Sequence, residues 1–392
     1  MAYLLKKPTS EEKLQILGKT ARFDVCGIPG LFARKSKKLQ RFKFIYPAVG
    51  KGGCVRLFKV LQTNCCEGNC FYCANRKDRN FVRISFSPDE LARLFIQYHR
   101  RGLVDGLFLS SAIHGSAIRS QEETFKTLYL VRKKYGYKGY IHYKVLPGSE
   151  DSLIEKCASL ADRLSINLEA PSPHHLSKLS PTKDFSEQLL AGVEKIFALN
   201  RKNPLKAGIT TQLVVGAAGE SDKEIVTFSH FLYRNYNLWR VYYSGFVPIK
   251  DTPLENTPAC HPLREVRLYQ ADFLIRKYGF SPEELPFQKN GNLPREKDPK
   301  LAWALSHPEK FPLEINKADY WELLRVPGIG RISARKIIMK RREGKITSLE
   351  ELKATGCVVK RARNFITLNG KFFPSSENGK DLDQQLFLLE EI

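Results

Sequence analysis

Short β-rich runs alternate with amphipathic helical stretches through the middle of this chain, and that alternation limits the fold more than any other feature. The predicted strands span residues 55–62, 106–110, 140–146, 164–168, 210–215 and 241–247. The predicted helices between them include residues 88–98, 122–134, 151–160 and 186–199. Alternation of this kind predicts an α/β fold, in which helices connect parallel strands and ligands bind at the carboxyl ends of the strands.

Three cysteines with the spacing C-x3-C-x2-C follow the first predicted strand, at Cys66, Cys70 and Cys73. Three thiolates on one short loop can hold three corners of a [4Fe-4S] cube and leave the fourth iron without a protein ligand. The aromatic residue Tyr72 stands directly before the last of these cysteines. Cys65 would give the spacing C-x4-C-x2-C, and we assign it as a neighbour of the loop rather than as a ligand.

Zinc, disulfides and plain burial are the alternative roles for these thiols. A structural zinc site normally has a fourth Cys or His, and no second C-x2-C or paired His follows within about 20 residues. Disulfides need an oxidising compartment, whereas residues 1–7 lack an apolar signal core and nine cysteines is an odd number. The cluster is therefore the favoured interpretation. Scattered cysteines in apolar surroundings are assigned as ordinary buried thiols: Cys26, Cys54, Cys157, Cys260 and Cys357.

Net charge points to a polyanionic partner. The formal charge is +23 and the isoelectric point is near 9.6, and nucleic acid is the leading candidate for such a chain. Residues 1–59 hold 14 Lys and Arg against 3 Asp and Glu, and residues 313–372 hold 14 against 6. The run from Arg34 to Lys43 could equally be a solvated face. No apolar stretch approaches a membrane span, so we expect no membrane partner and a cytoplasmic location.

The segment Val326-Pro327-Gly328-Ile329-Gly330 and the basic helix that follows it resemble a helix-hairpin-helix, a DNA-binding module. Glycines relax the hairpin backbone, and exposed N–H groups with the next helix N-terminus form a phosphate site. We expect Ile329 and Ala334 to lock the two helices together. A protein-binding hairpin is the alternative. The predicted nucleic-acid contacts are Gly328, Ile329, Gly330, Arg331, Arg335 and Lys336.

The cysteine motif with its flanking Tyr72 resembles the signature of the radical S-adenosylmethionine (SAM) superfamily. This resemblance implies a partial (βα)6 barrel that binds a [4Fe-4S] cluster and SAM. It also implies that the free iron binds SAM and that an electron from the cluster cleaves SAM to a 5′-deoxyadenosyl radical. The electron donor would be a reductase or a flavodoxin-type protein.

The same resemblance implies SAM contacts at the strand ends, although two positions depart from the family pattern. Two serines stand where many members have Gly-Gly-Glu, and Glu220 lies four residues after Gly216 instead of three. We expect Ser221 and Glu224 to form a capping box, and we assign no acid or base role to His142. The implied cofactor contacts are Tyr72, Ser110, Ser111, Asn167, Glu169, Gln212 and Gly216.

As a whole, the chain resembles the family described as DNA modification/repair radical SAM proteins. The predicted architecture is a basic N-terminal extension (1–52), the partial barrel (53–250), a helical linker (251–312), an all-α helix-hairpin-helix domain (313–372) and a tail (373–392). The resemblance favours a radical SAM enzyme that modifies or repairs DNA. An RNA-modifying enzyme and a non-catalytic DNA-bound iron-sulfur protein are the alternatives. Catalytic residues, the target nucleotide and the oligomeric state stay open.

Overall fold

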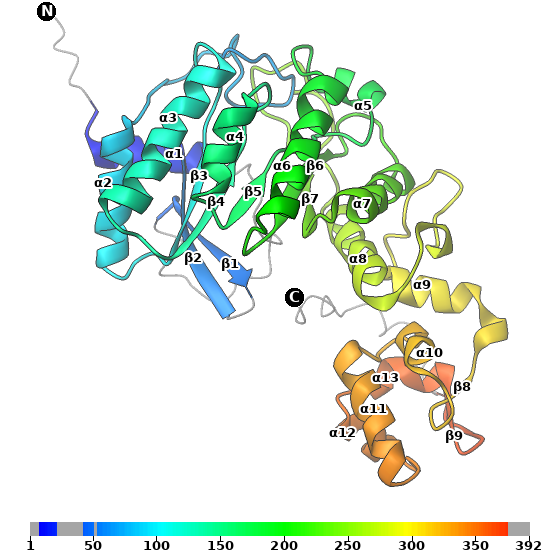
Figure 1. Cartoon of the computed structure of the whole chain (residues 1–392). Helices are drawn as coiled ribbons and strands as arrows, with labels where there is room; N and C mark the ends of the chain where they lie inside the picture. The colour runs from blue at the N-terminus through cyan, green and yellow to red at the C-terminus, as the bar shows by residue number, and fades with distance from the viewer. Residues whose placement is uncertain (1–7, 22–41, 51–52, 375–392) are drawn as a thin grey trace, which may run out of the picture. The chain divides into compact units, whose positions relative to one another are not determined.

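A curled seven-stranded sheet forms the core of the first part of the chain (Figure 1). The computed structural model describes residues 8–21, 42–50 and 53–374. Strands follow one another in chain order, and all neighbours are parallel except the first pair. The strands are β1 (Ile45–Gly50), β2 (Gly53–Leu61), β3 (Gly106–Ser110), β4 (Tyr140–Lys144), β5 (Arg163–Ser165), β6 (Ile209–Val215) and β7 (Arg240–Gly245). The predicted α/β class and six-stranded parallel core are confirmed.

The helices of this part pack along the sheet because their apolar faces match its buried strands. Strands β3 and β6 are buried along their whole length, as expected when helices cover a parallel sheet. Figure 1 shows α2, α3, α4 and α6 along one side of the strands. The helices are α1 (Ser10–Thr20), α2 (Pro88–Arg100), α3 (Ala117–Tyr129), α4 (Asp151–Ala158), α5 (Pro173–Ser177), α6 (Ala191–Lys202) and α7 (Asp222–Tyr236).

Local capping residues set where several helices begin. The Ser87 hydroxyl accepts the Glu90 N–H at 3.3 Å, and Pro88 occupies the first turn of α2, where its missing N–H costs nothing. The predicted capping box of α7 is confirmed: the Ser221 hydroxyl accepts the Glu224 N–H, and the Glu224 carboxylate accepts the Ser221 N–H at 2.7 Å. Among the described residues, no helix is long and apolar enough to cross a membrane.

Two features of the sheet differ from the sequence expectation. Strand β1 was not predicted. It lies in the segment assigned to the basic extension and pairs antiparallel with β2. Strand β5 ends at Ser165 rather than at residue 168. Beyond it the backbone leaves the regular ladder, and Glu169 adopts a positive φ of 63° while bridging to Leu213. Pairing with β6 therefore continues through one isolated contact, which fixes the position of Glu169.

The described part of the chain divides into two compact units, one within residues 1–220 and 231–261 and the other within residues 221–230 and 262–391. The second unit is mainly helical, as predicted, and it also contains a small sheet of three short strands. Its helices are α8 (Pro262–Tyr278), α9 (Pro299–Ser306), α10 (Tyr320–Arg325), α11 (Arg331–Glu343), α12 (Leu349–Ala354) and α13 (Val359–Ala362). Its strands are β8 (Leu313–Glu314), β9 (Ile366–Leu368) and β10 (Lys371–Phe372).

Two helical hairpins contact each other in this unit. Residues 326–330 join α10 to α11, and residues 355–358 join α12 to α13. Gly328 and Gly356 have nearly equal positive φ values of 86° and 89°, a backbone conformation that favours glycine. The buried Lys300, from the predicted linker, donates its Nζ proton to the Ile329 carbonyl oxygen at 2.6 Å. Most of the predicted basic run (34–43) and most of the predicted tail lie outside the described residues.

Candidate functional site

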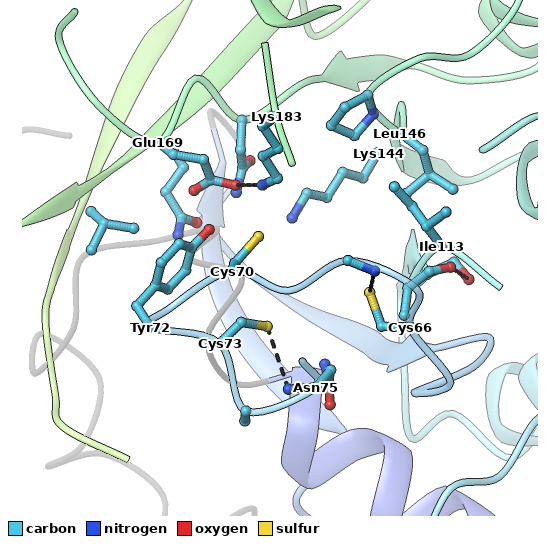
Figure 2. Close-up of a pocket in the computed structure, with 18 of the residues that line it drawn as sticks. Cys66, Cys70, Tyr72, Cys73, Asn75, Ile113, Lys144, Leu146, Glu169 and Lys183 are labelled. Carbon is cyan, nitrogen blue, oxygen red and sulfur yellow. Dashed lines mark hydrogen bonds and ion pairs between the residues drawn. The ribbon is translucent and has the colours of Figure 1, made fainter. Parts of the chain in front are cut away.

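A cavity of about 470 Å³ lies at the carboxyl ends of the parallel strands. Its wall contains the cysteine loop after β2 and residues at or just beyond the ends of β3, β4, β5, β6 and β7. This is the edge of a parallel α/β sheet where ligands bind. Figure 2 shows the side chains that converge on this space. Every residue that lines it belongs to the first compact unit.

The three predicted cluster ligands, Cys66, Cys70 and Cys73, all line this cavity. Backbone N–H groups hold two of the sulfurs in place: Gly68 donates to Cys66 Sγ at 3.3 Å, and Asn75 donates to Cys73 Sγ at 3.4 Å (Figure 2). Cys65, assigned as a neighbour, is not among the lining residues, and its Sγ lies 3.8 Å from the Ser85 hydroxyl. The loop therefore presents three thiols to the cavity.

This donor set fits an iron-sulfur cluster. The seven cysteines that the structure describes are all free thiols. No three of the described His, Cys, Asp and Glu side chains are placed to hold one metal ion together. A cube does not need such convergence, because each thiolate binds a different iron. Amide N–H donors to cysteine sulfur also suit a cluster, since they stabilise negative charge on the ligands.

Burial keeps one of the three thiols protonated before metal binds. Removal from water raises the pKa of Cys73 to about 12, and the neighbouring Cys70 adds to the increase. A thiol must lose its proton to become a ligand. Binding of iron at Cys73 is therefore coupled to proton release.

Five of the seven predicted SAM contacts lie in the cavity wall: Tyr72, Ser111, Asn167, Glu169 and Gln212. The other two are not among the lining residues. Ser110 is the last residue of β3 and is 1% exposed. The Gly216 N–H donates to the Glu220 carboxylate, which also accepts the Ala218 N–H at 3.0 Å. Glu220 thus shapes the turn after β6.

Glu169 is the centre of a buried polar cluster at one end of the cavity. Its Oε1 lies 2.8 Å from Lys183 Nζ, and their side chains are 6% and 16% exposed. The Tyr72 hydroxyl contacts the same carboxylate (Figure 2). Burial, followed by the Glu169 charge, raises the pKa of Tyr72 well above its usual value of 10.0. The phenol is therefore neutral at physiological pH and can donate a hydrogen bond to the Glu169 carboxylate.

Sequence reasoning missed two lysines in the wall, Lys144 and Lys183. Lys144 is the last residue of β4, so its position at a strand end was an available signal. Lys183 lies in the loop between α5 and α6, where the sequence pattern contains no comparable signal. Figure 2 shows the Lys144 amino group extending into the space between Cys70 and Cys66. The cavity thus combines three thiols, the two carboxylates of Glu67 and Glu169, and two lysine side chains.

His142 belongs to a separate environment inside the sheet. It is 2% exposed, and its Nε2 lies 2.8 Å from the Ser165 hydroxyl. Burial, assisted by the nearby cations Arg163, Lys144 and Lys59, lowers its pKa well below the usual 6.5. The imidazole is therefore neutral and hydrogen-bonded to Ser165 inside the sheet.

The hairpin around Gly328 provides a second candidate site, in the second compact unit. Gly330 is the N-cap of α11, and no side chain among the described residues caps that helix end. Arg335 and Lys336 are exposed on α11, whereas the side chains of Ile329 and Ala334 are buried, as predicted for residues that lock the hairpin. The predicted contact at Ile329 is not supported by its surroundings, because its side chain is buried and its backbone N–H and carbonyl are hydrogen-bonded to Val326 and Lys300. Free N–H groups at a helix N-terminus beside basic side chains form an anion site.

Comparison with known proteins gives two matches within the chain. Residues 60–232 match the model of the radical SAM superfamily, and residues 310–356 match a helix-hairpin-helix motif. The uncharacterised protein MJ0785 of Methanocaldococcus jannaschii is 25% identical over 224 residues, which cover 54% of this chain and 55% of that protein. The chain therefore spans about half the length of this curated relative.

Similarity to solved structures is partial, and two of them illustrate it. One is the FeFe-hydrogenase maturase HydG from Carboxydothermus hydrogenoformans, with a TM-score of 0.45 and 13% identity over 55% of this chain and 50% of that one. The other is coproporphyrinogen III oxidase (HemN) from Escherichia coli, which is described as a radical SAM enzyme. Its TM-score is 0.36, with 14% identity over 54% of this chain and 50% of that one.

Proposed function

We propose that residues 60–232, the part of the chain that matches the radical SAM superfamily model, bind a [4Fe-4S] cluster and SAM and use a 5′-deoxyadenosyl radical to modify or repair DNA. One observation carries the cofactor half of this proposal. Cys66, Cys70 and Cys73 share a single cavity with Asn167 and Glu169, which come from a segment about 100 residues away in sequence. Its volume of about 470 Å³ lies in the range of small-molecule pockets.

Different residues in the cavity wall would bind different parts of the cluster and of SAM. The three cysteines would hold three irons, which leaves one iron to bind the amino and carboxylate groups of SAM. The Glu169 carboxylate would accept hydrogen bonds from the ribose hydroxyls. The Asn167 amide could donate or accept, and Gln212 lies beside them on β6. Cluster and SAM, when bound, supply a carbon radical that can abstract hydrogen from a substrate. Tyr72 closes one side of the site and holds the Glu169 carboxylate in place.

DNA is the proposed substrate because of the second compact unit. Backbone N–H groups at the start of α11 would hold a phosphate, and Arg335 and Lys336 would extend the contact along the backbone. The formal charge of +23 favours the same partner. Phosphate contacts carry little information about the sugar. The experiment must therefore also test RNA as a substrate.

Incubation with candidate nucleic acids tests this proposal directly. Anaerobically reconstituted protein is reduced and mixed with SAM and with damaged DNA, undamaged DNA or RNA. Formation of 5′-deoxyadenosine is measured, and nucleosides are compared by mass spectrometry after digestion. We expect SAM cleavage with every sample and a changed nucleoside only with DNA. A changed nucleoside only in RNA would redirect the proposal to RNA modification. Absence of SAM cleavage by cluster-loaded protein would favour a non-catalytic iron-sulfur protein.

A further inference from the structure

The loop between α5 and α6 lies directly against the cysteine loop. The Phe71 N–H donates to the Leu179 carbonyl oxygen at 2.8 Å, which joins the two backbones. One residue further along, the Ser180 hydroxyl lies 3.3 Å from Cys70 Sγ. Ser180 is 2% exposed and Cys70 is 8% exposed. A hydroxyl therefore contacts a predicted cluster ligand where water is largely excluded.

The same loop places a positive charge near the cluster ligands. Burial alone would lower the pKa of Lys183, but the charges of Glu169, Cys70 and Cys73 raise it above its usual value of 10.5. Lys183 is thus an ammonium ion at physiological pH. It faces one carboxylate on one side and the thiols Cys70 and Cys73 on the other (Figure 2).

A hydrogen-bond donor and a cation beside a cluster have a predictable effect on its redox chemistry. One-electron reduction adds negative charge to a cluster that already carries three thiolates. Donors to the sulfurs and nearby positive charges stabilise the reduced form more than the oxidised form, so they raise the reduction potential. The effect is larger in a buried site because the effective dielectric constant is lower there.

We propose that Ser180 and Lys183 are positioning residues that raise the reduction potential of the cluster, Ser180 by donating a hydrogen bond to the Cys70 thiolate and Lys183 by its buried charge. This inference rests on the proposed function, because it requires the cluster at Cys66, Cys70 and Cys73. The electron itself comes from an external one-electron donor. Glu169 moderates the effect, since its carboxylate neutralises part of the Lys183 charge.

Matched variants from α5 and the loop after it test the proposal. Ser180→Ala removes the hydroxyl 3.3 Å from Cys70 Sγ, and Lys183→Gln removes the positive charge near Cys70 and Cys73. Ser177→Ala and Lys178→Gln are the controls, because Ser177 donates to the His174 carbonyl oxygen and Lys178 to the Ala218 carbonyl oxygen. Each protein is reconstituted anaerobically, its iron and sulfide are quantified, and the cluster potential is measured by redox titration followed by electron paramagnetic resonance.

We expect the potential to fall in Ser180→Ala and in Lys183→Gln and to stay unchanged in both controls. A shift equal to a tenfold change in the ratio of reduced to oxidised cluster, about 59 mV for one electron, is expected for Lys183→Gln. Glu169→Gln should shift the potential in the opposite direction, because it removes the negative charge beside Lys183. A purely structural role would not give shifts of opposite sign.

The possible failures are distinguishable. Unchanged potentials in fully loaded Ser180→Ala and Lys183→Gln proteins would overturn the tuning role and leave the proposed function standing. A parent protein that takes up no cluster would overturn both. Shifted potentials in a protein that does not cleave SAM would support the tuning role and contradict the proposed enzyme.

Discussion

Val358 donates its backbone N–H to the carbonyl oxygen of Gly328, 2.8 Å away, and so joins the two hairpins of the second unit. A Cβ atom on Gly328 would lie 2.5 Å from the Val358 carbonyl oxygen and 3.2 Å from the Ala362 amide nitrogen. The glycine is therefore required by contact between the hairpins, in addition to any approach of a phosphate. Loss of DNA binding in a Gly328 variant would not by itself identify a phosphate site.

Gly328→Ala should destabilise the second unit. The left-handed backbone costs an L-residue roughly 1–2 kcal/mol, and forced overpacking costs about 1–3 kcal/mol more. Gly344→Ala is the matched control, because its φ of 175° is extended and no atom lies within 4 Å of an added Cβ. Urea unfolding followed by tryptophan fluorescence measures both variants, since Trp303 and Trp321 lie in this unit. Equal stability of the two variants would contradict the contact.

Replacement of any of Cys66, Cys70 or Cys73 by Ala should abolish cluster binding and SAM cleavage. Each cysteine supplies a thiol to the same cavity, and a cube held at only two corners is poorly retained. Cys65→Ala is the control and should keep both properties. Iron analysis and the yield of 5′-deoxyadenosine provide the measurement. Retained cleavage in the Cys70 variant would show that the ligands are wrongly assigned.

Glu169→Gln should weaken SAM binding while the cluster stays in place. Loss of a hydrogen bond to a charged group costs about 1.5–3 kcal/mol, or roughly a tenfold to hundredfold increase in the dissociation constant. Glu194→Gln is the control, because Glu194 contacts Tyr236 on the surface, away from the cavity. Calorimetric titration of cluster-loaded protein with SAM provides the comparison. Equal affinity in the two variants would place Glu169 outside the SAM site.

Alkylation of Cys73 in metal-free protein should accelerate with pH well beyond the range of an ordinary thiol. Its pKa is raised to about 12 by burial, and only the thiolate reacts with iodoacetamide. The thiolate fraction therefore grows about tenfold per pH unit up to that value. Reaction rates at pH 8, 9 and 10, measured by peptide mass spectrometry, should rise by about that factor at each step. Levelling off near pH 9 would show that Cys73 titrates as an ordinary thiol.

Arg335→Gln combined with Lys336→Gln should reduce affinity for duplex DNA and its dependence on salt. Each lost phosphate contact lowers the log-log salt slope by about 0.9. Lys345→Gln with Lys353→Gln is a control of equal charge, since both lysines are exposed and lie outside α11. Fluorescence anisotropy at two salt concentrations measures the slope. The same slope in both double variants would indicate that α11 does not face DNA.

Local sequence pattern was sufficient for the parallel strands of the first unit, although not for β1. The six parallel strands and the helices between them were predicted because apolar periodicity over five to ten residues reflects local backbone geometry. The cysteine loop was recognisable for a similar reason, since the three cysteines lie within eight residues of one another in sequence. The end of β5 was harder to place. Asn167 and Glu169 line the same cavity as predicted, but through an irregular backbone at Glu169 rather than a continuing strand.

The tertiary structure alone decided which distant side chains complete the site. Ser180 contacts Cys70 although 110 residues separate them in sequence. Lys183 contacts Glu169, and it lies in a loop whose sequence has no regular periodicity. Val358 likewise meets Gly328 only because two hairpins close on each other. A strand or a metal loop leaves a repeating or spaced signal in the sequence, whereas a contact between loops depends on how the whole sheet curls. The sequence by itself therefore determined the elements and the cysteine motif, and only the fold determined the charges and hydrogen bonds around them.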